Sequence, residues 1–240
     1  MMKERDMTQP ISIVTGAGSG IGAACARMLA ERGHAVVLVG RRGDKLESVR
    51  ASMTDPARHL AMPADVADCA LAYGVIDRTI EAFGRIDALV LAAGGAPRAT
   101  IDATTEAILE NSFRTNAFGP AFMVTRAWPQ FKAQRGGRVV FISTLGTSDP
   151  FPGFFAYAAS KSAVESFTRS IKAEGRSIGV KAFSVSPGCV ETAALRNNFP
   201  ESVIPASRAL APEVIAEIAV ACACGERDAD HGSVILVPSP

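Results

Sequence analysis

The sequence has almost no excess of charge of either sign. Its 240 residues carry 25 Lys and Arg against 24 Asp and Glu, which leaves a net charge of +1. Binding to nucleic acid or to an anionic membrane surface draws on a strong positive field, so we expect neither partner. With 48% hydrophobic and 20% charged residues, the composition also excludes a disordered chain, which would combine low hydrophobicity with high net charge.

Long apolar runs are missing as well. The richest stretches, Ala88 to Ala93 and Val214 to Cys224, fall short of the ~18 residues that a bilayer-spanning helix needs. The start of the chain, Met1 to Gln9, is charged and has no apolar core of the kind that a secretion signal carries. We therefore expect a cytoplasmic protein in which Met1 to Gln9 form a disordered leader.

Cysteine and histidine are scarce and show no ligand spacing. The five cysteines are an odd number scattered among apolar residues, which favours reduced thiols over a disulfide framework; they are Cys25, Cys69, Cys189, Cys222 and Cys224. None of the three histidines is spaced as one of a ligand pair. We expect no metal site.

What the sequence does contain is a regular alternation of short apolar runs and longer helical segments. The expected strands are Ile11 to Thr15, Ala35 to Val39, His59 to Met62, Asp87 to Ala93, Arg138 to Ile142, Val180 to Val185 and Ser233 to Val237. The expected helices include Ile21 to Arg32, Asp68 to Phe83, Thr104 to Phe131, Ala156 to Gly175 and Pro212 to Cys222.

This alternation predicts an α/β fold. Strands that are apolar throughout, rather than alternating, are typical of a parallel sheet with helices on both faces. We therefore predict a Rossmann-type, doubly wound, seven-stranded parallel sheet, formed by residues 1–240 as a single domain. The loops Thr144 to Phe155 and Thr192 to Leu210 follow strands, so they should shape a pocket at the carboxyl edge of the sheet.

A glycine-rich turn joins the first strand to the first helix. It runs from Thr15 to Gly22 and has the pattern T-G-x-x-x-G-x-G rather than the commoner G-x-G-x-x-G. Glycine allows a pyrophosphate to approach the backbone closely, and the amino end of the helix stabilises its charge. The alternative is a turn without a ligand, although four glycines in seven residues would then weaken the fold without serving to bind anything.

The second strand ends at Gly40, Arg41 and Arg42, where a site selective for NAD would carry an acidic residue for the ribose hydroxyl. Two guanidinium groups suit a 2'-phosphate instead. We therefore favour NADP(H) as the cofactor and keep NAD(H) as the alternative, in which Arg41 and Arg42 would be a solvated pair of charges.

Ser143, Tyr157 and Lys161 form a candidate catalytic group. Lys161 follows Tyr157 by four residues, so both lie on one face of a helix. We expect the nearby ammonium to lower the pKa of the phenol, which lets Tyr157 exchange a proton with a carbonyl oxygen. Ser143 could donate a hydrogen bond to the same oxygen. Taken alone, a Y-x-x-x-K pattern more often marks a pair on a helix surface.

These motifs do not stand alone, and the chain from Ile11 to Val237 resembles the classical short-chain dehydrogenase/reductase (SDR) family. The matching segments occur in the family's order and spacing. They are the glycine turn, Asp65-Val66, Asn116-Ala117-Phe118-Gly119, Ser143, Tyr157 with Lys161, and Pro187-Gly188-Cys189-Val190-Glu191-Thr192.

The resemblance implies specific roles. Asn116, Ser143, Tyr157 and Lys161 would form the catalytic tetrad, with Lys161 also binding the ribose and Asn116 holding a water that relays protons. Residues expected to bind the cofactor are Thr15, Gly16, Gly18, Ser19, Gly20, Ile21, Gly22, Arg41, Arg42, Asp65, Val66, Ala93, Gly94, Tyr157, Lys161, Pro187, Gly188, Val190 and Thr192. Without the family match, Asp65 could simply favour a helix amino end, and Asn116 could satisfy buried backbone groups.

Three departures from the family pattern stand out. Leu91-Ala92-Ala93-Gly94 replaces the usual Asn-Asn-Ala-Gly, although Gly94 keeps room for a close approach to the cofactor. The segment from Thr192 to Arg208 is a short substrate lid, which implies an open pocket. The end Val237-Pro238-Ser239-Pro240 replaces a glycine pair near a common subunit contact, so the expected homo-oligomer could be a dimer or a tetramer.

The expected function is reduction of a ketone or aldehyde, or the reverse, with Tyr157 as general acid or base. Phe151, Phe154, Phe155 and Phe199 could line an apolar substrate pocket, or could pack the loop or an interface. One alternative function is a non-catalytic dinucleotide sensor or scaffold, since a fold alone does not establish chemistry. A methyltransferase of similar architecture would need no Tyr-Lys pair.

Overall fold

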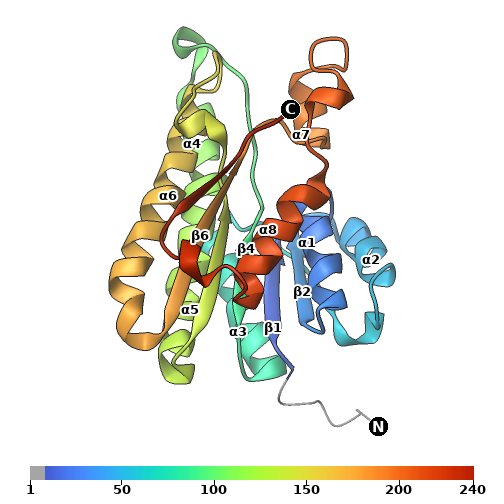
Figure 1. The fold of residues 1–240 in the computed structure, drawn as a ribbon, viewed down its shortest axis with the longest axis vertical. Coiled ribbons are helices and arrows are strands. Elements are labelled where there is room, and N and C mark those ends of the chain that lie inside the picture. Colours follow the sequence, from blue (N-terminus) through green and yellow to red (C-terminus); the bar gives the residue numbers. More distant parts are fainter. Residues whose placement is uncertain (1–8) are drawn as a thin grey trace.

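The computed structural model describes residues 9–240 and forms a seven-stranded parallel sheet covered by helices on both faces (Figure 1). The strand order is β3-β2-β1-β4-β5-β6-β7, and every neighbouring pair is parallel. The strands are β1 (Ile11–Thr15), β2 (Ala35–Gly40), β3 (Leu60–Pro63), β4 (Ala88–Leu91), β5 (Gly137–Ile142), β6 (Val180–Pro187) and β7 (Val234–Val237). The predicted fold class is confirmed. The expected leader lies, apart from Gln9, outside the described residues.

Eight α-helices connect and cover the strands in the described part of the chain. They are α1 (Gly20–Glu31), α2 (Gly43–Ala51), α3 (Cys69–Phe83), α4 (Glu106–Phe113), α5 (Gly119–Gln134), α6 (Phe155–Gly175), α7 (Ala193–Asn198) and α8 (Pro212–Cys224). Among the described residues, none of these helices is long and apolar enough to cross a membrane. All five cysteines are free thiols, and Cys25 and Cys222 are fully buried.

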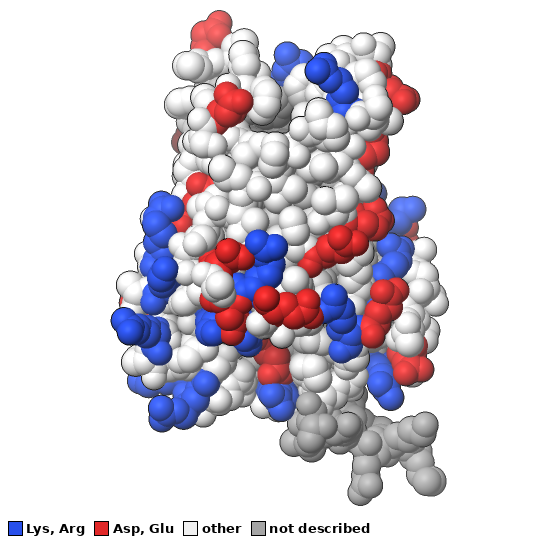
Figure 2. Space-filling view, in the orientation of Figure 1, with Lys and Arg blue, Asp and Glu red and all other residues white. Residues whose placement is uncertain are grey.

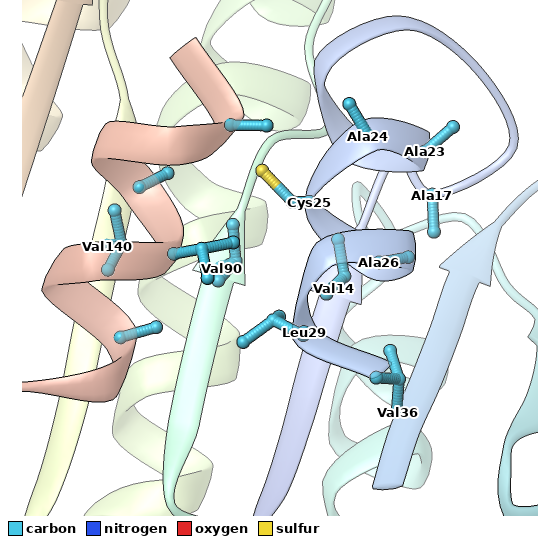
Figure 3. Close-up of a cluster of buried hydrophobic side chains, with 14 of the residues drawn as sticks. Val14, Ala17, Ala23, Ala24, Cys25, Ala26, Leu29, Val36, Val90 and Val140 are labelled. Carbon is cyan, nitrogen blue, oxygen red and sulfur yellow. The ribbon is translucent and has the colours of Figure 1, made fainter. Parts of the chain in front are cut away.

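Successive strand residues point to opposite faces of the sheet, and so the protein has two hydrophobic cores. On β1, for example, Ile13 belongs to the core under α3, α5 and α6, whereas Val14 belongs to the core under α1, α2 and α8. Figure 3 shows the second of these cores, with Cys25 and Leu29 of α1 packed over the strands. Burial on both faces explains why the strand sequences are apolar throughout.

The structure differs from the sequence-based prediction in three elements, and it also contains α7, within a segment expected to be a loop. The fourth strand ends at Leu91, not Ala93, because the backbone N–H of Ala93 donates to Thr15 Oγ1 and turns the chain out of the sheet. Helix α2 was not expected. The helix predicted over Thr104 to Phe131 begins at Glu106 and is interrupted by a π-helical turn, Arg114–Phe118, between α4 and α5.

Candidate active site

Two hollows adjoin at the carboxyl edge of the sheet. The first, here called the arginine pocket, has a volume of about 170 Å³ and lies between the glycine turn, the start of α2 and the end of β3. The second, here called the tyrosine cleft, has a volume of about 420 Å³ and lies between the ends of β4, β5 and β6 and the segment containing α7. Gly16, Ser19, Ala93 and Gly94 line both hollows. A single elongated ligand could therefore occupy the two together.

The glycine turn separates β1 from α1 and is compact because its glycines have no side chains. Gly16 and Gly20 adopt left-handed backbone angles, with φ of 68° and 53°. A Cβ at Gly22 would overlap the carbonyl of Gly16, so this position admits only glycine. Ser19 precedes α1 without capping it through its side chain, which leaves the amino end of this helix open to an anionic ligand. Gly18 lines the arginine pocket, and Ile21 lines the tyrosine cleft.

Three basic side chains line the arginine pocket. Arg41 and Arg42 are exposed, as the sequence led us to expect, and Lys45 from the first turn of α2 joins them. None of the three forms an ion pair with any residue in the described range 9–240. Sequence reasoning missed Lys45, because no helix was expected there to bring it back beside the two arginines.

The opposite wall of the arginine pocket is formed by the turn after β3. Asp65 Oδ1 accepts a hydrogen bond from the N–H of Ala67 at 3.0 Å, and Val66 is buried. Both residues line the pocket, together with Thr115 from the π-helical turn. Asp65 therefore shapes its own turn and still borders the hollow, whereas the amino end of α3 is capped by Asp68.

Tyr157 and Lys161 reach the tyrosine cleft from one face of α6, as predicted. Lys161 is 5% exposed, and its Nζ donates to the carbonyl oxygen of Ile142 at 2.6 Å. Burial lowers the pKa of Lys161 from 10.5 to about 8, because a cation is less stable away from water. An unpaired buried ammonium is costly, so its position in a cleft indicates a functional role.

The pKa of Tyr157 does not shift in the expected direction. Desolvation of the phenol raises its pKa, and a hydrogen bond with the side chain of Thr144 lowers it, with a net rise. We expected the Lys161 ammonium to lower this pKa. It does not, because desolvation of the buried phenol is the larger effect and outweighs the hydrogen bond from Thr144.

Ser143 and Thr144 both border the cleft at the end of β5, and their hydroxyls have different partners. Ser143 is 2% exposed, and its Oγ donates to Glu165 Oε1 at 2.7 Å. Thr144 Oγ1 accepts from the N–H of Gly146 at 3.2 Å, and a hydrogen bond from this side chain lowers the pKa of Tyr157. Thr144 was missed as a site residue. Consecutive residues leaving a strand point to opposite sides, and the sequence did not show which of the two hydroxyls faces the tyrosine.

Asn116 lies in the π-helical turn and is fully buried. Its Nδ2 donates to the carbonyl of Gly95 at 2.9 Å and to Ser160 Oγ at 3.0 Å, and its Oδ1 accepts from the N–H of Gly95 at 2.9 Å. The side-chain amide thus fixes the loop after β4 against α6. Holding a relay water through Asn116 stays a prediction.

The outer part of the tyrosine cleft is apolar. Phe154 packs edge-on against Tyr157, with 5.9 Å between ring centroids, and also contacts Phe199. Phe151, Phe154 and Phe199 line the cleft, as proposed from the sequence, but Phe155 does not and is 51% exposed. Leu195 and Ile204 from the lid complete the apolar lining. Apart from Lys161, no residue of the described range that lines the cleft is charged.

The segment after β6 closes the inner end of the cleft, where Pro187, Gly188, Val190 and Thr192 lie. Thr192 caps α7: its Oγ1 accepts from the N–H of Leu195 at 3.3 Å, and it packs near Gly20. The C-terminal Ser239 supports the same segment, because its Oγ accepts from the N–H of Cys189 at 3.0 Å. In residues 9–240, no group of three or more His, Cys, Asp or Glu residues could hold a metal ion.

Comparisons with known proteins agree with this geometry. A family model described as short chain dehydrogenase matches residues 10–202. An uncharacterised oxidoreductase of Staphylococcus haemolyticus is 32% identical over 182 residues, which cover 76% of this chain and 78% of the relative. A solved short chain dehydrogenase/reductase family protein superimposes with a TM-score of 0.86 at 31% identity and covers 98% of this chain and 97% of its own.

A second solved structure resembles the protein in fold. It is a 3-ketoacyl-(acyl-carrier-protein) reductase from Brucella melitensis, complexed with NADH, with a TM-score of 0.88 and 24% identity. The superposition covers 97% of this chain and 98% of that one.

Proposed function

The chain belongs to the short-chain dehydrogenase family and is an NAD(P)-dependent oxidoreductase of small molecules; we propose that it interconverts an apolar ketone or aldehyde and the corresponding alcohol, with NADP(H) as cofactor and Tyr157 as general acid or base. The observation that carries this proposal is the position of Tyr157 one helical turn from a buried Lys161, beside Thr144, in an apolar cleft that adjoins the glycine turn.

The residues present fit a dinucleotide. The uncapped amino end of α1 and the glycine turn suit a pyrophosphate, and Pro187, Gly188, Val190 and Thr192 border the inner cleft where the nicotinamide end would lie. When bound, the cofactor supplies or accepts the hydride. Three unpaired basic groups, Arg41, Arg42 and Lys45, favour NADP(H), because the 2'-phosphate adds a charge that NAD(H) lacks.

Proton transfer is assigned to Tyr157, and stabilisation of the substrate oxygen to Thr144. As hydride reaches the carbonyl carbon, negative charge grows on the oxygen, and the hydroxyls of Tyr157 and Thr144, which line the same cleft, can both donate to that oxygen. In the reverse direction the phenol must lose a proton. The hydrogen bond from Thr144 favours the phenolate and so helps Tyr157 to act as a base.

The substrate is proposed to be apolar and uncharged near its carbonyl. The cleft volume of about 420 Å³ lies in the usual range for small-molecule sites, and its outer wall consists of aromatic and aliphatic side chains. Arg196 does not add a charge to this apolar wall, because its guanidinium binds Glu191 and the carbonyl of Ile204 within the lid. We further propose a cytoplasmic homodimer or homotetramer that forms no complex with nucleic acid.

The proposal is tested by assaying NADPH and NADH with a panel of ketones, aldehydes and alcohols, in wild type and Tyr157→Phe. General acid–base catalysis contributes roughly 10²- to 10⁴-fold, so Tyr157→Phe should lower kcat by at least about 10²-fold while the Kd for NADPH stays within about twofold. Tyr73→Phe is the matched control, since Tyr73 is the other tyrosine and packs from α3 against Phe122 and Arg126 of α5.

The outcome separates the proposal from its alternative. NADPH binding without turnover of any panel compound would favour a sensor or scaffold. Turnover that survives Tyr157→Phe unchanged would refute the assignment of the general acid.

A further inference from the structure

Three consecutive residues at the end of β5 face three residues spaced by four along α6. The carbonyl of Ile142 accepts from Lys161, the hydroxyl of Ser143 donates to Glu165, and Thr144 lines the same cleft as Tyr157, whose pKa its side chain lowers by a hydrogen bond. Positions 157, 161 and 165 form one row on the helix, because residues four apart lie above one another. This row fixes how the end of β5 lies against α6. Two of its three members already belong to the proposed site, and Glu165 is the third.

Glu165 also binds the turn that follows Thr144. The hydroxyl of Thr147 lies 2.9 Å from Glu165 Oε1 and 3.0 Å from the carbonyl oxygen of Thr144. One carboxylate oxygen therefore accepts hydroxyls from both sides of Thr144 in the sequence. Hydrogen bonds to an ionised acceptor are stronger than those between neutral groups. Glu165 forms no ion pair with any cation in residues 9–240, so these hydroxyls are its partners.

We propose that Glu165 is a positioning residue, whose carboxylate holds Ser143 and Thr147 so that the Thr144 hydroxyl between them faces Tyr157. This inference rests on the proposed function, because it explains what keeps the proposed oxygen-stabilising hydroxyl in place. It also assigns Ser143 a supporting role in place of the catalytic one expected from the sequence. Groups that orient a reacting side chain typically affect rate by about 10- to 100-fold, since a shift of about 1 Å can cost that much.

The test compares two substitutions at position 165. Glu165→Met removes the acceptor and keeps a similar volume, and it should lower kcat at least about tenfold while the KM for NADPH stays within about twofold. Glu165→Gln keeps the acceptor oxygen and should restore kcat to within about threefold of wild type. Glu174→Gln, at an exposed glutamate of the same helix, is the control and should change neither constant.

A double-mutant cycle tests the partnership with Ser143. If the two act as one unit, Ser143→Ala with Glu165→Met should lose no more kcat than the worse single variant. Fully multiplicative losses would overturn the pairing. If Glu165→Met fails to fold, Thr147→Val removes one donor to the same oxygen and takes its place in the comparison, with a fall in kcat expected.

The result is distinguishable from a failure of the proposed function. If Tyr157→Phe abolishes turnover but Glu165→Met changes only the melting temperature, Glu165 is merely structural and this inference alone is wrong. If Tyr157→Phe leaves turnover unchanged, Tyr157 is not the general acid and the proposed function is wrong. A fall in kcat for Glu165→Met would then show that Glu165 does not act by placing Thr144 beside Tyr157.

Discussion

At the scale of single residues, Lys161 is a residue of the proposed active site whose burial makes the folded protein less stable. Its pKa falls from 10.5 to about 8 on burial. Between these values the unfolded chain binds a proton that the folded protein does not, so the free energy of unfolding rises with pH across that window. Below about pH 8 both states are protonated, and the folded protein bears the full cost of the buried ammonium, roughly 3 kcal/mol.

We therefore predict that Lys161→Met is more stable than wild type at about pH 7, by roughly 1–3 kcal/mol, even after the bond to the Ile142 carbonyl is lost. The difference should shrink as the pH approaches about 10, where the wild-type lysine is neutral in the folded state. Urea unfolding at both pH values measures it. The same variant should lose cofactor affinity and turnover. A wild type that is the more stable protein at neutral pH would contradict the prediction.

Single residues also mark the limit of what the sequence could reveal. The pair Tyr157 and Lys161 was predictable because helical spacing alone puts positions four apart on one face. Which of Ser143 and Thr144 faces Tyr157 was not predictable, because it depends on which of the two hydroxyls binds Glu165, two helical turns beyond Tyr157. The same holds for the pKa of Tyr157: desolvation of the phenol by the surrounding protein outweighs the influence expected of the lysine.

At the scale of elements, strands and apolar helices were predictable, and polar or interrupted helices were not. Helix α2 buries only Leu46 and Val49, so its sequence lacks the apolar stripe by which a surface helix is usually recognised. The π-helical turn at Arg114–Phe118 could not be predicted for the opposite reason: its residues continue the helical pattern, so the sequence shows no interruption. Its cause is tertiary: Asn116 binds the backbone of Gly95, and Gly119 packs directly on Val66.

The start of α2 leads to a prediction about cofactor choice. Lys45 lies beside Arg41 and Arg42 in the arginine pocket without a counter-ion among the described residues, so a 2'-phosphate would gain a charge-assisted bond from it. Lys45→Ala should raise the KM for NADPH about three- to tenfold and leave the KM for NADH nearly unchanged. Lys132→Ala, an exposed lysine of α5 far along the chain, is the control. Equal losses with both cofactors would show that Lys45 does not contact the extra phosphate.

At the scale of the whole molecule, the net charge is close to neutral and the sheet is continuous. Figure 2 shows charged side chains of both signs side by side across the lower part of one face, with a run of Lys and Arg along its left edge. The sheet has no break, because β4 pairs with β1 on one side and with β5 on the other. The last helix, α8, packs beside the first, α1, and lies over β4, β5 and β6 (Figure 1). The first and the last helix of the described chain therefore lie in one layer over the same sheet.

We accordingly propose that residues 9–240 fold as one domain and predict a single cooperative unfolding transition. Trp128, the only tryptophan, lies on α5 in the carboxyl-terminal half and reports on that half alone, whereas far-ultraviolet circular dichroism reports on all the helices. The two transitions should coincide. NADPH contacts both hollows in our proposal, so it should shift both curves together, by about 2.7 kcal/mol at a hundredfold excess over Kd. A tryptophan transition displaced from the dichroism curve, or a shift seen by one probe only, would show that the cofactor half unfolds independently.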